Sequence, residues 1–143
     1  MCSVVVDSSR KITLSSNSSL LAAWAREIER CYGAAAGEVF SIEAKAKKND
    51  VQKRLERIDS MEKNWDAICA QLKTLPEPAY LKALLDDIGC PSTPEQIGIN
   101  AADLKDSFMY CKEVRPRYTI FQTVYDLGLM DELSDRIIKE LNM

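Results

Sequence analysis

Apolar residues recur at intervals of three and four along most of the chain, which is the spacing of one face of an α-helix. Residues that favour helix starts and helix ends fall between these runs and divide them into separate helices. We expect helices over about residues 18–32, 37–48, 51–74, 78–88, 94–97, 101–111, 116–127 and 131–141. The pattern therefore predicts an all-α helical bundle from residue 17 onward.

The first sixteen residues follow a different pattern. Residues 3–14 hold two short runs of β-prone side chains around a polar turn. An isolated hairpin is marginal in water, so we expect either a short docked β-hairpin or a loose tail. The predicted organisation is an N-terminal tail or hairpin over residues 1–16 and a helical domain over residues 17–143.

The longest predicted element, residues 51–74, carries its apolar side chains on one stripe. Trp65 lies on this stripe, and we interpret it as core rather than as a residue that stacks on a ligand. Asp50 is expected to cap this helix, and Asn100 to cap the helix that begins at Ala101. The helix that begins at Pro116 is expected to bury four apolar side chains, namely Ile120, Phe121, Val124 and Leu127.

The amino-acid composition excludes several classes of function. The chain has 143 residues, 46% of them hydrophobic and 29% charged, which is ordinary for a single globular domain. A net charge of −3 and a pI near 5.1 argue against general binding to nucleic acid. No apolar run approaches a membrane span, and the start does not read as a signal peptide, so we expect a cytoplasmic protein without a membrane partner. Five scattered cysteines fit buried thiols in a reducing compartment better than disulfides.

Two charged stretches are candidates for ligand binding. The first lies between Ala44 and Arg57, where six cations accompany two acids. We interpret it as a solvated helix face, with an acidic partner or a phosphorylated ligand as the alternative. Its cations are Lys45, Lys47, Lys48, Lys53, Arg54 and Arg57.

The second stretch is Arg115-Pro116-Arg117. Proline favours the first position of a helix and excludes its predecessor, so a helix should begin at Pro116 with Arg115 just outside it. Arginines are disfavoured at this positively charged end unless an anion docks there. Two guanidinium groups and free amides would form a cradle for phosphate or carboxylate. The alternative is that both arginines pair with acids such as Glu113 or lie in water.

Several motifs, taken in order, resemble one family. Residues 115–120, Arg-Pro-Arg-Tyr-Thr-Ile, followed by Tyr-Asp-Leu-Gly-Leu-Met-Asp-Glu-Leu, resemble the C-terminal signature of sn-glycerol-1-phosphate dehydrogenases. These enzymes belong to the iron-dependent alcohol dehydrogenase and dehydroquinate synthase-like superfamily. Residues 84–99 and 55–68 resemble passages of the same family, and the likeness covers roughly residues 34–141.

The resemblance implies the C-terminal helical domain of an oxidoreductase. The complete enzyme would use NAD(P) and a divalent metal to move a hydride to or from a glycerol phosphate or dihydroxyacetone phosphate. Arg115, Arg117 and Tyr118 would anchor the substrate anion, with Lys47 as a further candidate. Residues 43–50 resemble a passage near the family's substrate, in which Glu43, Lys47 and Asp50 keep the residue type. Lys48 stands where an aromatic is expected there, and Asn49 where a histidine is.

The chemistry of that family is missing from this chain. The family holds its metal with one aspartate and two histidines, and this chain has no histidine. Its five glycines never form a phosphate-binding loop, so no cofactor site is expected in this chain. Without histidine or a recognisable base beside any thiol, a cysteine hydrolase has little support. We expect no catalytic residue, no metal ligand and no turnover by the chain alone.

A non-catalytic function is the alternative. Helices that belong against a dehydrogenase core would leave apolar surface if that core were absent. The chain would then be a helical interaction module that binds a complementary dehydrogenase domain or forms a homo-oligomer. The side chains most suspected of exposure are Trp24, Phe40 and the triplet 4–6.

Overall fold

The computed structural model describes residues 17–143, in which all regular secondary structure is helical. This confirms the predicted all-α helical bundle. The predicted hairpin or tail lies outside the described residues, so that prediction and the boundary after residue 16 stay predictions. The chain divides into two compact units after Ala36, and the second unit is Gly37–Met143.

In the first unit, helix α1 (Asn17–Tyr32) is followed by the 3-10 helix η1 (Gly33–Ala35). Gly33 follows α1 with a φ of +50°, a conformation that glycine adopts without strain, as expected for a helix stop. Ile28 is fully buried, and Trp24 is half-buried rather than exposed.

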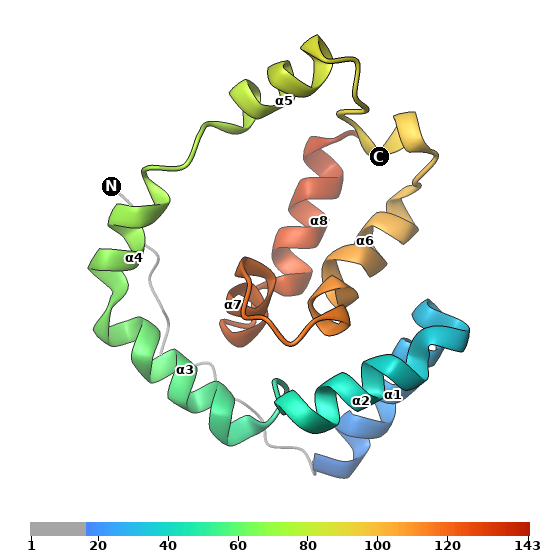
Figure 1. The fold of residues 1–143 in the computed structure, drawn as a ribbon, viewed down its shortest axis with the longest axis vertical. Helices are drawn as coiled ribbons and strands as arrows, with labels where there is room; N and C mark the ends of the chain where they lie inside the picture. The colour runs from blue at the N-terminus through green and yellow to red at the C-terminus, as the bar shows by residue number, and fades with distance from the viewer. Residues whose placement is uncertain (1–16) are drawn as a thin grey trace. The chain divides into compact units, whose positions relative to one another are not determined.

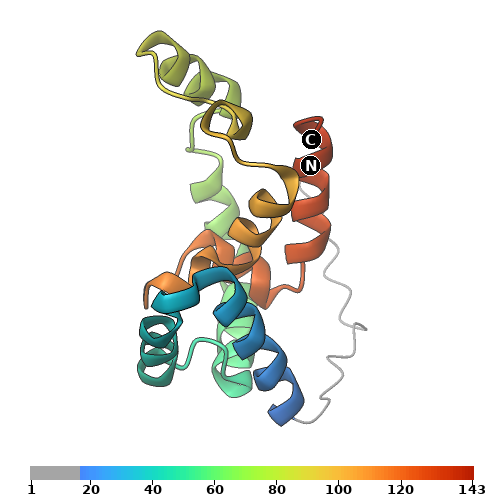
Figure 2. The ribbon, with the colours of Figure 1, turned by 90° about the vertical axis from the view of Figure 1, so that its right-hand side faces the viewer.

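The second unit contains the remaining helices (Figures 1 and 2). Helix α6 lies beside α8, η3 follows α6, and α7 contacts α3, α8 and η3. Most of the polar contacts described below join the α2–α3 segment to η3 and α7. The elements are α2 (Ala36–Ala46), α3 (Val51–Lys63), α4 (Trp65–Leu72), α5 (Pro78–Asp87), η2 (Pro94–Ile97), α6 (Ala101–Tyr110), η3 (Cys111–Val114), α7 (Ile120–Asp126) and α8 (Met130–Glu140).

The predicted helix caps are confirmed. The Asp50 carboxylate accepts a hydrogen bond from the Lys53 amide at 3.0 Å and so fixes the start of α3. Asn100 does the same for α6, because its Oδ1 accepts from the Asp103 amide at 3.0 Å. At η2 both halves of a capping box are present: the Gln96 side chain accepts from the Thr93 amide at 3.0 Å, and the Thr93 side chain accepts from the Gln96 amide.

The prediction of one helix over residues 51–74 is wrong. Asn64 interrupts it with φ −113° and ψ 14°, so that α3 ends at Lys63 and α4 begins at Trp65. Its side-chain amide donates to the Ser60 carbonyl at 2.8 Å, a local bond that competes with regular helix geometry. The apolar stripe is consequently only partly covered, since Met61 is buried and Trp65 half-buried while Leu55 is 44% exposed.

Apolar burial is also smaller than expected elsewhere. Ile120, predicted as core, is 56% exposed, while Phe121, Val124 and Leu127 are half-buried. Cys90 is exposed, and the thiols of Cys31, Cys69 and Cys111 are half-buried. Within residues 17–143, no helix has both the length and the apolar character that a bilayer span requires.

Candidate functional site

The structure places the Arg115–Arg117 stretch differently from the prediction. Arg115 is extended, with φ −145° and ψ 148°, as the following proline requires. The helix, however, begins at Ile120, so Arg115, Pro116 and Arg117 form a bend between η3 and α7. The prediction that these residues form an anion cradle at the start of a helix is therefore wrong, because the helix begins at Ile120. Both arginine side chains are exposed, and neither makes a hydrogen bond or ion pair with a described residue.

Helix α7 begins after an extended residue. Thr119 has φ −131° and ψ 171°, which is the backbone conformation of an N-cap residue, although its side chain makes no capping hydrogen bond. The extended backbone also lets Tyr118 turn toward α7. Its hydroxyl accepts from the Thr123 hydroxyl at 3.1 Å and lies 3.5 Å from Asp126 Oδ2.

A buried lysine binds the backbone of this bend. Lys48, in the turn between α2 and α3, is only 6% exposed. Its ammonium group donates to the Arg115 carbonyl at 2.9 Å and also to the Lys112 carbonyl. The bend is thereby fixed to a residue 67 positions earlier in the chain. Interpreting Lys48 as part of a solvated helix face was wrong.

Glu113 is the centre of this buried cluster, and it does not pair with the two arginines. Its carboxylate, 1% exposed, binds the Lys112 ammonium group and accepts from Asn49 Nδ2 at 3.1 and 3.2 Å. Lys48 Nζ lies 3.7 Å away from it. Lys112 also donates to Asn49 Oδ1 at 2.9 Å and lies 3.9 Å above the Tyr125 ring. Burial lowers the pKa of Lys112, against the opposing pull of Glu113.

A second ion pair lies next to the first. Arg57 binds Asp126 through Nε at 2.6 Å and Nη2 at 2.8 Å, a two-point pair that raises the pKa of Arg57. The same guanidinium donates to the Lys48 carbonyl at 2.8 Å, which joins the two pairs. Gln122 donates to Asp126 Oδ1 at 3.1 Å, and Gln122 Oε1 is buried without a hydrogen-bond partner among the described residues.

Arg54 likewise departs from the interpretation of a solvated face. It donates to the carbonyls of Asp126 at 2.8 Å and Tyr125 at 3.1 Å, at the C-terminal end of α7. Positive groups are favoured at that end of a helix. The cations of residues 44–57 thus divide into two groups. Lys48, Arg54 and Arg57 are buried or half-buried and bind η3 or α7, whereas Lys45, Lys47 and Lys53 are exposed.

The structure brings only some of the predicted site residues together. Lys47 is exposed with φ +50°, and among the described residues its side chain makes no hydrogen bond or ion pair with the two arginines or Tyr118. Glu43, in the same passage, accepts from the backbone amides of Lys48 at 3.2 Å and Asn49 at 2.9 Å. The two residues that depart from the family pattern, Lys48 and Asn49, are therefore the ones that link this passage to η3.

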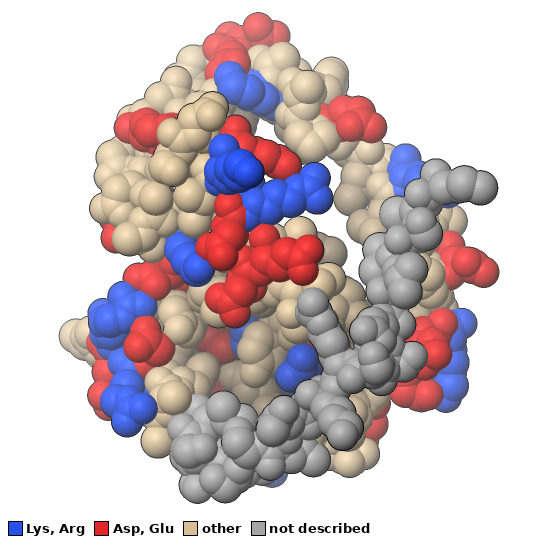
Figure 3. Space-filling model, turned by 180° about the vertical axis from the view of Figure 1, so that it is seen from behind, with Lys and Arg blue, Asp and Glu red and all other residues tan. Residues whose placement is uncertain are grey.

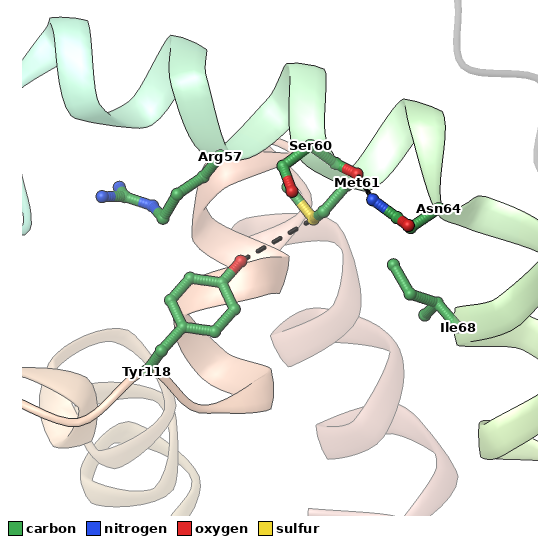
Figure 4. A pocket seen from close by; sticks show the side chains of 6 residues that line it. All are labelled: Arg57, Ser60, Met61, Asn64, Ile68 and Tyr118. Carbon is green, nitrogen blue, oxygen red and sulfur yellow. Dashed lines mark hydrogen bonds between the residues drawn. The ribbon is translucent and has the colours of Figure 1, made fainter.

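Tyr118 also lines a shallow pocket beside α3 (Figure 4). The pocket has a volume of about 360 Å³, and in Figure 4 the Tyr118 ring points toward Met61, whose sulfur lies 3.7 Å from its hydroxyl. Burial raises the pKa of Tyr118, so the phenol stays protonated at neutral pH. The six lining residues are Arg57, Ser60, Met61, Asn64, Ile68 and Tyr118.

The charged surface is mixed. On the face in Figure 3, Lys and Arg are interspersed with Asp and Glu among the described residues. Such a surface lacks the broad basic field that a nucleic-acid phosphate backbone requires. Within residues 17–143, no three His, Cys, Asp or Glu side chains are grouped so as to hold a metal ion.

Comparison with protein-family models, with curated proteins and with solved structures finds no match for this chain. The buried pairs are mutually neutralised, so their arrangement supports a rigid loop rather than acid–base chemistry. What the loop offers to a ligand is two exposed guanidinium groups and the Tyr118 pocket.

Proposed function

We propose that this chain is the helical part of a glycerol-1-phosphate dehydrogenase-like oxidoreductase and contributes an anion-binding wall to it. The nicotinamide cofactor and the divalent metal would be held by another polypeptide or domain. The chain by itself would bind a phosphorylated small molecule without converting it. The resemblance of the motifs over residues 34–141 supports the choice of family, and the exposed arginines of the Arg115–Arg117 bend support the anion-binding role.

The observation that supports the anion-binding role is that the two arginines are exposed and unpaired within residues 17–143. Arg115 and Arg117 are exposed and have no anionic partner among the described residues. The acid beside them, Glu113, is committed to Lys112 and Asn49. Two unpaired guanidinium forks on one short bend are well suited to bind a phosphate.

The bend is also rigid in advance of binding. Lys48 holds the Arg115 carbonyl, and Tyr118 is held by Thr123 and Asp126 at the other end. A loop that is ordered before its ligand arrives loses less entropy on binding. This supports binding by preformed geometry.

The experiment is calorimetric titration of the chain with sn-glycerol 1-phosphate. Arg117→Ala should weaken binding at least about tenfold, since a charge-assisted hydrogen bond contributes about 1.5–3 kcal/mol. Lys73→Ala, which removes an exposed cation outside the bend, is the matched control and should leave binding unchanged. No binding by the unaltered chain, or equal affinity of Arg117→Ala, would refute the anion-binding role.

A second candidate function is favoured by a separate observation. The apolar side chains of α5 are exposed from end to end, which a monomeric globular domain rarely tolerates. A non-catalytic module that associates through α5 accounts for that exposure. It is compatible with the first proposal, because an association helix and an anion-binding bend lie on different segments.

A further inference from the structure

The Tyr118 pocket has a mostly apolar lining. Met61, which is 8% exposed, lies between the Tyr118 ring and Ile68 in Figure 4. Ser60 and Asn64, which also line the pocket, are exposed. Small-molecule sites typically combine an apolar lining of this kind with a few polar groups that fix the orientation of the ligand.

The charge at this pocket is already balanced. Arg57 lines the pocket, but its guanidinium group binds the Asp126 carboxylate at 2.6 and 2.8 Å. The Tyr118 hydroxyl lies 3.5 Å from the same carboxylate. A phosphate inside the pocket would therefore meet an arginine that is already neutralised, with a carboxylate close to it that repels negative charge. The pocket is suited to an uncharged part of a ligand.

Free positive charge lies next to the pocket along the chain. Arg117 directly precedes Tyr118, so the Cα atoms of the two residues are about 3.8 Å apart. Arg117 is exposed and makes no ion pair within the described part of the chain. A ligand that uses both features carries an anionic group at one end and an apolar group at the other.

The size and lining of the pocket favour an aromatic ring as the apolar group. Its volume is about 360 Å³, and cavities of about 150 Å³ are large enough for benzene. The Tyr118 ring can pack against a second ring, and the Met61 sulfur can contact a ring edge. One substituted ring therefore fits beside both side chains.

We propose that the Tyr118 pocket is a subsite for the ring of an aryl phosphate whose phosphate group is bound by the Arg115–Arg117 bend. This inference rests on the anion-binding role proposed above and narrows the class of phosphorylated ligand. A glycerol phosphate gains only the contacts to the arginines, whereas an aryl phosphate also removes apolar surface from water.

The first test compares two phosphate esters that differ only in their apolar group. Phenyl phosphate and methyl phosphate are titrated calorimetrically into the full chain at about pH 8, where both are dianions. Phenyl phosphate should bind at least about tenfold more tightly, because only its ring fills the pocket. Arg117→Ala should weaken binding of both esters by a similar factor. Equal affinities of the two esters for the unaltered chain would overturn the inference.

The second test fills the pocket. Ser60 is an exposed residue of α3 that lines the pocket, so Ser60→Trp should occupy the space of the ring and reduce the preference for phenyl phosphate to within about twofold. Ser41→Trp is the matched control, because Ser41 is an exposed serine of α2 that does not line the pocket. The control should keep the tenfold preference. A preference that survives Ser60→Trp would place the ring elsewhere.

A third measurement needs no substitution. Nuclear Overhauser contacts should join the ring protons of phenyl phosphate to the methyl groups of Met61 and Ile68 in the unaltered chain. Contacts only to methyl groups outside the pocket would overturn the assignment, whether or not Ser60→Trp folds.

The outcomes separate this inference from the broader function. If methyl phosphate binds and phenyl phosphate binds no more tightly, the anion-binding role stands and the aryl subsite is refuted. If neither ester binds, both the anion-binding role and the subsite are refuted.

Discussion

Glu113 balances more positive charge than any other buried residue described. Lys48 and Lys112, 6% and 5% exposed, both lie within ion-pair distance of its carboxylate. Burying charges costs several kcal/mol unless their partners and remaining hydrogen bonds are present. Asn49 supplies those bonds by donating to Glu113 and accepting from Lys112. The cluster therefore stabilises the fold only when it is complete.

Removing the negative charge should be strongly destabilising. In Glu113→Gln the two lysines would face each other without a counter-charge, and we expect a loss of about 3 kcal/mol in the free energy of unfolding. Urea unfolding at neutral pH measures it. Glu62→Gln, an exposed substitution on α3, is the control and should change the value by less than about 0.5 kcal/mol. Similar losses in the two variants would contradict the balancing role of Glu113.

Lys112 gives the cluster a dependence on alkaline pH. Burial lowers its folded-state pKa, so between that pKa and the ordinary value of 10.5 the unfolded chain binds more protons than the folded chain. Stability from this group is therefore fully present above the unfolded pKa and is lost as the pH falls through the folded pKa. The net lowering already includes Glu113 and Glu43, which raise the pKa, and Lys48, which lowers it.

The test compares the pH dependence of stability of the unaltered chain with that of Lys112→Met. As the pH is raised from 7 toward 9.5, the unaltered chain should gain stability relative to Lys112→Met, which has no titrating group there. Burial also raises the pKa of Tyr125, so the ring below Lys112 stays neutral across this range. Urea midpoints of both chains at each pH give the difference. A difference that stays constant, or that shifts in favour of Lys112→Met, would show that the ammonium is not disfavoured in the fold.

At the scale of the helices, local signals determined what the sequence could predict. Asp50 and Asn100 each need only the amide three residues ahead, so their caps were readable without any tertiary information. The break at Asn64 was missed because its side-chain bond to the Ser60 carbonyl overrode the apolar period. The late start of α7 was missed because residues 115–117 form a bend instead of the first helical turn that Pro116 favours.

The Asn100 cap allows a direct test. Asn100→Ala removes the oxygen that accepts from the Asp103 amide, so we expect a loss of about 1 kcal/mol in the free energy of unfolding. Asn100→Ser keeps a capping oxygen and should lose much less. Thermal or urea unfolding of the two variants decides between them. If serine were no better than alanine, the amide would have another acceptor.

The candidate site could not be predicted from the sequence for a different reason. Lys48 and Lys112 are 64 residues apart, and nothing in the local pattern around either indicates that they share one carboxylate. Charge composition suggested a solvated face, whereas packing of the α2–α3 turn against η3 buries Lys48, and Arg54 and Arg57 are half-buried against α7. Arg115 and Arg117 were singled out from the sequence, but the sequence did not show that a lysine would fix their bend.

At the scale of the whole molecule, association and local folding should be linked. A ten-residue helix gains its stability from packing, so self-association through α5 and folding of α5 should increase together with protein concentration. Hydrogen exchange measures this amide by amide, since protection reports the free energy of local opening. The amides of residues 82–88 should become more protected over about a hundredfold increase in concentration.

Helix α8 of the same molecule is the internal control for this prediction. Amides of α8, which packs beside α6, should keep the same protection at every concentration. In Leu84→Glu the α5 amides should exchange rapidly throughout, with α8 unchanged. Protection of α5 that is high and independent of concentration would mean that the helix is stable without a partner, and association through α5 would then be contradicted.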